Sequence, residues 1–348
     1  MAMAEVTVRG AGIFGLSVAW ACLRRGAKVI VVDPHGPGAG ASGGLVGALA
    51  PHVPENWNDK KAFQLDALLM AGNFWTEVRL AGGIDPLYAR DGRLQPVPDA
   101  AALALGRARA GQALDLWRGQ AAWEVIPAEG QDWAPESPTG WLIRDTLSAR
   151  LHPRRACAAL AAALVAGGAR IEGEAPDRGA VIWATGAAGL SETSRATGRP
   201  LGAAVKGQAA LLRLDRRDRP QLFTDGLHVV PHGDGTVAVG STSERDFADP
   251  ARTDARTDAL LDDVIARARA AVPALRDAPV LERWAGLRPR ARSRAPVLGP
   301  HPTRPGQFIA NGGFKIGFGM APMVGEAMAA LVLEGRDDAI PPGFRPVP

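Results

Sequence analysis

Three glycines near the start of the chain have a spacing that suits the binding of a phosphate group. Gly10, Gly12 and Gly15 form the pattern G-x-G-x-x-G. The first glycine allows a tight turn, the second leaves room for a pyrophosphate, and the third lets a helix pack closely on a sheet. Asp33 follows in the same segment, and its carboxylate can accept hydrogen bonds from both hydroxyls of a ribose. These residues predict a dinucleotide site, and the carboxylate argues against NADP.

The segments around these glycines favour the same interpretation. An apolar run around Val6 and Val8 predicts a strand before the turn, and residues 28–32 predict a second strand that ends at Asp33. Between them lies a predicted helix with one apolar face, which ends near Gly26. The backbone N–H groups at its start would direct a partial positive charge at a phosphate. The glycine pattern alone is weak, but the order strand, glycine turn, helix, strand and aspartate is specific.

The remainder of the chain predicts more than one sheet. Residues 180–186 form a fully apolar strand typical of a parallel sheet, yet it comes more than a hundred residues after the first unit. That interleaving is typical of flavoproteins, whose cofactor domain is assembled from separated pieces. Residues 205–239 alternate with period two and contain a hairpin turn at 232–235, which predicts an α+β second domain. Further helices are predicted at 63–80, 100–117, 153–166 and 257–272, further strands at 169–172 and 307–310, and a last helix with Pro322 in its first turn and Gly335 at its end.

Composition excludes several classes of protein. Lys and Arg exceed Asp and Glu by 40 − 36 = 4 in the 348 residues, and no basic run is interleaved with aromatic residues, so we expect no nucleic acid partner. The six histidines are scattered and predict no metal site. The two cysteines, Cys22 and Cys157, lie in separate predicted helices with apolar neighbours, so we expect neither a disulfide nor a metal pair. Glu326 interrupts the most apolar stretch, and the first strand leaves no room for a signal peptide, so we expect a cytoplasmic protein without a membrane span.

Several separated motifs together resemble the FAD-dependent amino-acid and amine oxidases, the group of glycine oxidase, D-amino acid oxidase and sarcosine oxidase. The resemblance covers essentially the whole length and is greatest to glycine oxidase. The motifs that carry it are the segment 10–33, Ser42 with GALAP at 47–51, ATG at 184–186, VKGQ at 205–208, LHVVP at 227–231, VGST at 239–242, AGLRP at 285–289, and GFKIG at 313–317 leading to Ala321 and Pro322.

The resemblance implies a fold of two parts. We expect an α/β, Rossmann-like FAD-binding domain of the glutathione-reductase type, assembled from residues 1–60, 140–200 and 290–340. A substrate-binding α+β domain with a mixed or antiparallel sheet is expected from residues 61–139 and 201–289, with a tail at 341–348. A homo-oligomer stays open.

The same resemblance assigns candidate site residues. Arg288 is expected to clamp a substrate carboxylate, and Lys315 to share the anion or polarise the flavin edge. The family commonly adds a tyrosine to this clamp, but Tyr88 is the single tyrosine here and His228 occupies the matching hairpin position, either as a substrate ligand or as a structural residue. No cysteine lies near Arg288 or Lys315 in the sequence, so the FAD is expected to be non-covalent. The expected FAD contacts are Gly10, Gly12, Ile13, Phe14, Gly15, Asp33, Ser42, Gly43, Ala184, Thr185, Gly186, Gly312, Gly313, Phe314, Lys315 and Ile316.

The implied activity is oxidation of glycine or another small amino acid or amine. A hydride would pass from the substrate α-carbon to flavin N5, and oxygen would be reduced to hydrogen peroxide, in a reaction that supplies an imine for thiamine thiazole synthesis in glycine oxidases of this group. Three alternatives stay open: an amino-acid dehydrogenase that reduces quinone, a tRNA-modifying FAD oxidase acting on a carboxymethylaminomethyl group, and a flavin-binding module without turnover. Peroxide formation separates the first from an oxidase, and salt-dependent tRNA binding would support the second.

Overall fold

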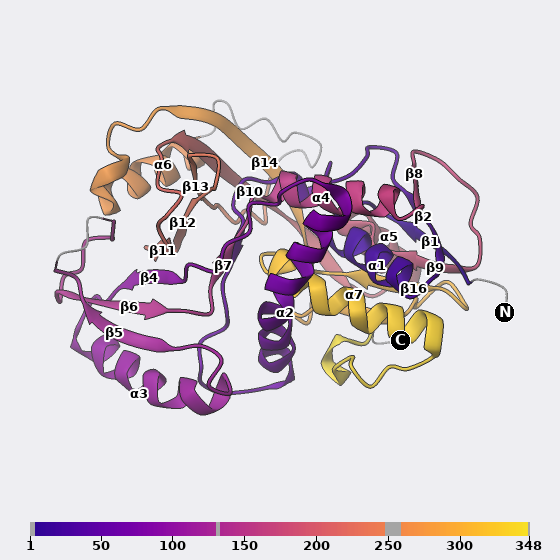
Figure 1. The fold of residues 1–348 in the computed structure, drawn as a ribbon, viewed down its shortest axis with the longest axis horizontal. Helices are drawn as coiled ribbons and strands as arrows, with labels where there is room; N and C mark the ends of the chain where they lie inside the picture. Colours follow the sequence, from indigo (N-terminus) through magenta and orange to yellow (C-terminus); the bar gives the residue numbers. More distant parts are fainter. Residues whose placement is uncertain (1–3, 130–132, 248–258, 347–348) are drawn as a thin grey trace.

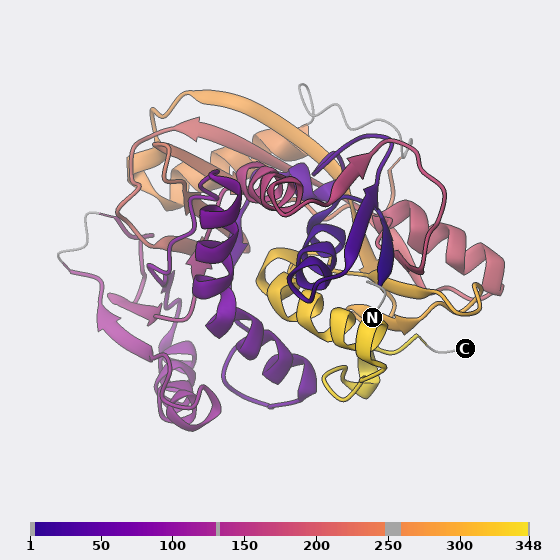
Figure 2. The same ribbon diagram turned by 45° about the vertical axis from the view of Figure 1, so that its right-hand side comes forward.

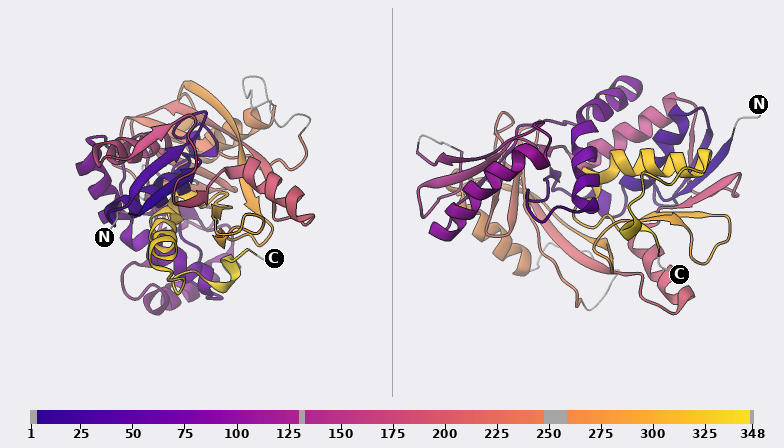
Figure 3. Two further views of the ribbon diagram at one scale, coloured as in Figure 1. Left: turned by 90° about the vertical axis from the view of Figure 1, so that its right-hand side faces the viewer. Right: turned by 90° about the horizontal axis from the view of Figure 1, so that it is seen from below.

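The computed structural model describes residues 4–129, 133–247 and 259–346, and two large sheets organise it (Figure 1). A six-stranded sheet with several helices forms one end of the molecule, and an eight-stranded sheet forms the other (Figure 3). A third, two-stranded sheet pairs β3 (Ala48–Leu49) with β7 (Ala149–Arg150). The predicted combination of a Rossmann-like unit with a second, mixed sheet is confirmed.

The six-stranded sheet contains the glycine-rich unit. Its strands lie in the order β15-β16-β9-β1-β2-β8, and every neighbouring pair is parallel except β15 with β16. Val8 is in register with Val31 and Ile182, and all three side chains are fully buried, as the apolar sequence of these strands predicts. The strands are β1 (Glu5–Arg9), β2 (Lys28–Val32), β8 (Arg170–Glu172), β9 (Ala180–Trp183), β15 (Val297–Pro300) and β16 (Phe308–Asn311).

Helices from distant parts of the chain pack together beside this sheet (Figure 2). The helix after the first strand, α1 (Ile13–Arg24), contacts α4 (Pro153–Ala166) and α7 (Gly317–Glu334), and α2 (Asp59–Gly82) also contacts α4 and α7. At Gly325 of α7 a Cβ atom would lie 2.6 Å from the carbonyl oxygen of Ser17, so the absence of a side chain lets α7 approach α1. A further helix, α5 (Gly186–Thr197), contacts β16 and also β10 and β14 of the larger sheet.

The last helix departs from its prediction at one end. We expected Pro322 in the first turn, but α7 begins at Gly317 and Pro322 lies inside it, so the expectation is wrong. Two glycines, Gly317 and Gly319, precede Pro322, and α7 nevertheless includes both of them. Gly335 ends the helix with a φ of 68°, as predicted. Glu326 was expected to interrupt the most apolar stretch, yet by length and composition α7 is apolar enough to cross a membrane. However, 61% of it is buried inside the protein, as in a core helix.

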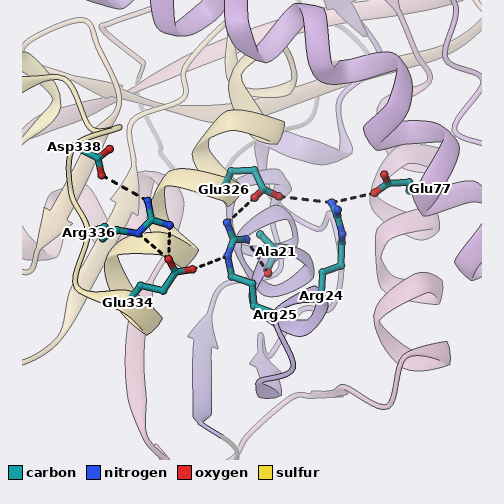
Figure 4. Close-up of polar contacts among 8 residues, drawn as sticks. All are labelled: Ala21, Arg24, Arg25, Glu77, Glu326, Glu334, Arg336 and Asp338. Atoms are coloured by element: carbon teal, nitrogen blue, oxygen red, sulfur yellow. Dashed lines mark hydrogen bonds and ion pairs between the residues drawn. The ribbon is translucent and has the colours of Figure 1, made fainter.

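A network of charged side chains links α1, α2 and α7 (Figure 4). Arg24 contacts Glu77 of α2 at 3.0 Å and Glu326 of α7 at 3.6 Å. Arg25 contacts Glu326 at 2.7 Å and Glu334 at 3.2 Å, and Glu334 also pairs with Arg336. These groups are partly exposed, so each pair contributes little to stability, on the order of 0–1 kcal/mol.

The eight-stranded sheet has the order β14-β10-β13-β12-β11-β4-β6-β5 and is antiparallel except between β11 and β4. The predicted hairpin turn at 232–235 joins β12 and β13, and Gly235 has a φ of 85°. The strands are β4 (Arg93–Pro96), β5 (Trp123–Pro127), β6 (Trp141–Asp145), β10 (Gly202–Arg213), β11 (Gln221–Thr224), β12 (Leu227–Pro231), β13 (Thr236–Gly240) and β14 (Val280–Ala291).

Besides α5, the helices α3 and α6 pack on this larger sheet. The helix α3 (Ala100–Leu116) contacts β5, and α6 (Ala259–Ala271) contacts β10, β12 and β13. The first two residues of the helix predicted at 257–272 lie outside the described residues. Short 3-10 turns occur at η1 (Ala41–Gly43), η2 (Pro273–Leu275) and η3 (Pro342–Phe344).

The two long strands β10 and β14 run from the larger sheet toward the cofactor unit, and Arg290 of β14 forms an isolated bridge with Gly313. The predicted domain boundaries stay a prediction. Within the structure, β6 belongs to the eight-stranded sheet although it lies in the segment 140–200, and α2 packs on α4 and α7 although it lies in the segment 61–139.

Candidate active site

A cavity of about 1210 Å³ is lined by residues from both large sheets. Residues from the β1–α1 turn, the end of β2 and the start of α7 line it together with residues of β4, β11, β12 and β14. Ligand pockets commonly have volumes of about 300–1,000 Å³, so this cavity has room for a large cofactor and a small substrate.

The β1–α1 turn has a geometry that only glycine fits. Gly10 has a φ of 107°, and a Cβ atom there would lie 2.4 Å from the carbonyl oxygen of Ala184. At Gly15 a Cβ atom would lie 1.9 Å from the carbonyl oxygen of Gly10, which cannot move without opening the turn. Gly12 lines the cavity directly. The structure therefore places Gly10 in a tight turn and Gly15 at the packing of α1, while the approach of a pyrophosphate to Gly12 stays a prediction.

The start of α1 faces the cavity without a side-chain cap. Gly12 is the N-cap residue, and no acidic residue lies in the first turn of the helix. The backbone N–H of Ile13 donates to the Oγ atom of Ser42 at 3.0 Å, so Ser42 holds the small-residue loop against the helix. Ile13, Phe14 and Ser42 all line the cavity. A helix start of this kind presents N–H groups and partial positive charge to an anion.

Asp33 lies at the end of β2 and is held by two backbone groups. Its Oδ2 atom accepts from the N–H of Ala11 at 2.8 Å, and its Oδ1 atom accepts from the N–H of His35 at 2.9 Å. Each carboxylate oxygen keeps further acceptor capacity toward the cavity, which Asp33 lines. The geometry fits a carboxylate that binds ribose hydroxyls.

The other expected cofactor contacts divide into two groups. Most of them line the cavity: Ala184, Thr185, Gly186, Gly313, Phe314, Lys315 and Ile316. Gly15, Gly43 and Gly312 do not line it and instead permit close backbone packing; at Gly43, for example, a Cβ atom would lie 2.4 Å from the carbonyl oxygen of Gly38. Ile316, the N-cap residue of α7, has no side-chain cap, so a second helix start also faces the cavity.

Arg288 lies on β14 with its guanidinium against a glycine of the neighbouring strand. Its Nη1 atom donates to the carbonyl oxygen of Thr242 at 3.0 Å, and the residue is 9% exposed. A Cβ atom on Gly207 would lie 2.0 Å from Cζ of Arg288, so the missing side chain of Gly207 makes the space that the guanidinium fills. Burial lowers the pKa of Arg288 to about 10, and nearby Glu244 opposes that shift.

Lys315 and His228 face the same cavity. Burial and the charge of Arg288 lower the pKa of Lys315. His228 lies on β12, and burial together with the charges of Arg93 and Lys315 lowers its pKa to about 3. Its Nδ1 atom is buried and has no hydrogen-bond partner within the described part of the chain. The structure thus brings Arg288, Lys315 and His228 to one cavity, with His228 neutral at physiological pH.

Sequence reasoning missed several cavity residues, of which Arg93 has the strongest chemistry. Arg93 lies on β4, is 6% exposed, and donates from Nε to Oδ2 of Asp145 at 3.0 Å. His52, Gln64, Phe223 and Trp284 also line the cavity. A lone arginine in the segment GRLQP has no spacing signature, and only the strand pairing shows where it faces.

The residues present fit FAD. Two uncapped helix starts, the glycine cradle and the doubly held Asp33 meet at one cavity. Cys22 and Cys157 are buried free thiols that do not line the cavity, and burial raises their pKa values to about 12. Within the described ranges, no three His, Cys, Asp or Glu side chains cluster in a way that could hold a metal ion.

The fold and the site define an FAD-binding oxidoreductase with a second, mixed sheet. A model of the FAD dependent oxidoreductase family matches residues 5–331, and the chain belongs to this family. It is 30% identical to the thiamine biosynthesis oxidoreductase ThiO of Rhizobium etli, over 95% of this chain and 97% of that protein. It is 26% identical to glycine oxidase of Geobacillus kaustophilus, over 94% of this chain and 92% of that protein.

Solved structures show the same fold. The crystal structure of glycine oxidase from Geobacillus kaustophilus matches with a TM-score of 0.82 and 22% identity, over 99% of both chains. Iminodiacetate oxidase from Chelativorans matches with a TM-score of 0.84 and 22% identity, over 99% of this chain and 100% of that chain. The expected family and cofactor are confirmed.

Proposed function

We propose that this chain is an FAD-dependent oxidase of glycine or another small amino acid or amine. The observation that carries the proposal is the buried guanidinium of Arg288, which lines the same cavity as the dinucleotide cradle. A buried arginine with a planar fork of donors suits a carboxylate. The names of the relatives, glycine oxidase and a thiamine biosynthesis oxidoreductase, support this chemistry and an imine product for thiamine synthesis.

Bound FAD would supply the redox chemistry, as the acceptor of two electrons from the substrate that oxygen then takes up as hydrogen peroxide. The residues of the chain have the task of orientation. Arg288 is held by Thr242 and by the space above Gly207, so its free donors have a fixed direction toward the cavity. A carboxylate bound there would fix the α-carbon relative to the cofactor and reduce the entropic part of the barrier.

The protein need not supply a general base in this proposal. His228 is uncharged at neutral pH, because its pKa is about 3, so it can accept a hydrogen bond without adding positive charge to the site. Lys315, whose pKa is lowered by burial and by the charge of Arg288, would assist in holding an anion. The uncapped start of α7 adds partial positive charge, which would stabilise negative charge on the reduced cofactor.

The proposal is tested with the purified, FAD-loaded protein. We expect a flavin absorption spectrum that bleaches under anaerobic conditions with glycine, sarcosine or a D-amino acid, and hydrogen peroxide formation in air. Replacing Arg288→Ala should abolish bleaching at substrate concentrations that saturate the wild type, whereas Arg292→Ala, at an exposed position just beyond β14, should bleach as the wild type does.

Other results point to the alternatives. Bleaching without peroxide, followed by electron transfer to a quinone, would identify a dehydrogenase. Salt-sensitive binding of tRNA would identify an RNA-modifying enzyme. A yellow protein that no amine bleaches would be a flavin-binding module, and the proposal would be abandoned.

A further inference from the structure

The register of the eight-stranded sheet places the substrate-side residues on one face. Arg288 pairs with Val205 on β10, two residues before Gly207. Ala209, two residues after Gly207, pairs with Gly240, and Gly240 pairs with His228. Directly paired residues point to the same face of a sheet, and so do residues two apart in one strand. Arg288, Gly207 and His228 therefore share the face that lines the cavity.

The same register continues to Arg93. His228 pairs with Phe223 on β11, and Gln221, two residues before Phe223, pairs with Arg93 on β4. Arg93 is thus on the same face, and its guanidinium carbon lies 5.7 Å from the ring centroid of Phe223. Because Arg288 extends over β10 and Arg93 extends over β11, about three strand spacings separate the two groups, which is roughly 14 Å at about 4.8 Å a spacing.

Arg93 has donors available for a ligand. Its Nε atom is used by Asp145, which is fully buried and also accepts from the N–H of Ser148 at 2.7 Å. Among the described residues, the two terminal nitrogens of Arg93 have no hydrogen-bond partner. Both nitrogens keep some accessible surface. Since the residue is 6% exposed and lines the cavity, those two nitrogens present donors to the cavity.

The charges around the cavity are unevenly distributed. The acidic residues that line it are Asp33 at the end of β2 and Glu174 just after β8, both on the cofactor side. The substrate sheet and the adjoining loop contribute three cations to the lining, Arg93, Arg288 and Lys315, and no carboxylate among the described lining residues. A small amino acid with one carboxylate would engage Arg288 and leave the donors of Arg93 without a partner, which is unfavourable in a buried site.

Building on the proposed function, we propose that Arg93 is a specificity-determining residue that binds a second carboxylate, so the preferred substrate is an amine carrying two carboxylates. Arg288 holds the carboxylate next to the oxidised carbon, and Arg93 holds the other through its terminal nitrogens. The stacking on Phe223 and the ion pair with Asp145 fix the plane of the guanidinium. The two guanidinium groups are ~14 Å apart, and a hydrogen bond at each end takes up part of that distance. The remainder leaves room for a short chain between the two carboxylates.

The test uses achiral substrate pairs that differ only in the second charge. N-(carboxymethyl)glycine is compared with its monoamide, N-(carbamoylmethyl)glycine, and N-(2-carboxyethyl)glycine with its monoamide. We expect the FAD-loaded wild type to have a kcat/KM at least roughly 30-fold higher for one of the acids than for its amide, as for truncation of a buried charged contact. Spectral titration of the flavin with succinate and with its monoamide, succinamate, gives the same comparison without turnover.

Variants assign this preference to Arg93. The double substitution Arg93→Gln with Asp145→Asn removes the ion pair without leaving a buried charge, and it should lower the ratio of acid to amide to near one. Arg93→Lys keeps a charge for Asp145 but loses the fork, so it should give an intermediate ratio. The matched control is Arg150→Lys, a buried arginine that pairs with Asp91 at 2.7 Å and does not line the cavity; it should keep the wild-type ratio.

The outcomes separate this inference from the proposed function. Oxidation of glycine or sarcosine with a wild-type ratio of acid to amide near one would overturn the role of Arg93 and leave the oxidase intact. A high ratio that persists in the double variant would also overturn it. Should the double variant not fold, the wild-type ratio and Arg93→Lys still decide. A flavin that no amine bleaches would instead refute the proposed function.

Discussion

The cofactor half and the substrate half of the cavity are built in different ways. The cofactor half is centred on one local unit, because Gly10, Gly12, Gly15 and Asp33 belong to one strand–helix–strand segment, which residues 184–186 and 313–316 join from elsewhere in the chain. The substrate half uses polar side chains from β4, β12, β14 and the loop before α7, which only long-range contacts bring together. A local unit fixes where the cofactor can bind, whereas long-range register fixes what is bound beside it. The two halves should therefore respond to different substitutions.

The largest effect is expected at Gly15, on the cofactor side. In Gly15→Ala, the new Cβ atom would lie 1.9 Å from the carbonyl oxygen of Gly10, so the turn and the packing of α1 must both shift. Overpacking of this kind costs typically about 1–3 kcal/mol, and we expect a lower melting temperature and little bound FAD. The flavin-to-protein absorbance ratio and a thermal unfolding curve measure both effects.

The control for that substitution is Gly173→Ala, at a glycine that lines the cavity and has no atom within 4 Å of the added Cβ position. It should keep the flavin content and melting temperature of the wild type. Equal flavin content in the two variants would show that the turn does not depend on the missing side chain.

A smaller effect, confined to the substrate side, is expected at Gly207. In Gly207→Ala, the added Cβ atom would occupy the space of the Arg288 guanidinium, so we expect a carboxylate ligand such as propionate to bind roughly 30-fold more weakly or worse, with FAD content unchanged. Flavin difference spectra give the dissociation constant.

A double-mutant cycle tests the cause. In the background of Arg288→Ala the space is vacant, so adding Gly207→Ala should change the dissociation constant less than about twofold. If the two losses simply add, Gly207 acts on something other than the position of Arg288.

The same contrast explains what the sequence could predict. The β1–α1–β2 unit was predicted with the bounds of β2 unchanged, because glycine spacing, apolar periodicity and Asp33 report on one local structure. The motif resemblance indicates Arg288 and Lys315 as site residues, and the structure places both at the cavity. Arg93 was missed because its orientation depends on the parallel pairing of residue 93 with residue 221, a contact across more than a hundred residues that no local pattern encodes. Pro322 was misplaced for a related reason: packing of α7 against α1 and α2 extends the helix beyond its local start signal.

The smallest expected effect is the pH dependence of carboxylate binding on the substrate side. Burial and Arg288 lower the pKa of Lys315, and burial lowers the pKa of Arg288 to about 10. Raising the pH through the lowered pKa of Lys315 and toward that of Arg288 removes positive charge, so propionate should bind more weakly on the alkaline side. Between pH 6 and 8 binding should be nearly constant, because His228, with a pKa of about 3, remains uncharged there.

Two variants sharpen this prediction. Lys315→Arg should move the first alkaline loss of binding to higher pH, because a guanidinium retains its proton more strongly than an ammonium group. His228→Gln should leave the profile between pH 6 and 8 unchanged. The measurement is the dissociation constant of propionate from flavin difference spectra across the pH range. A loss of binding centred near pH 6.5 that disappears in His228→Gln would show that His228 is charged at lower pH, and the cationic surroundings assigned to the substrate half would then be wrong.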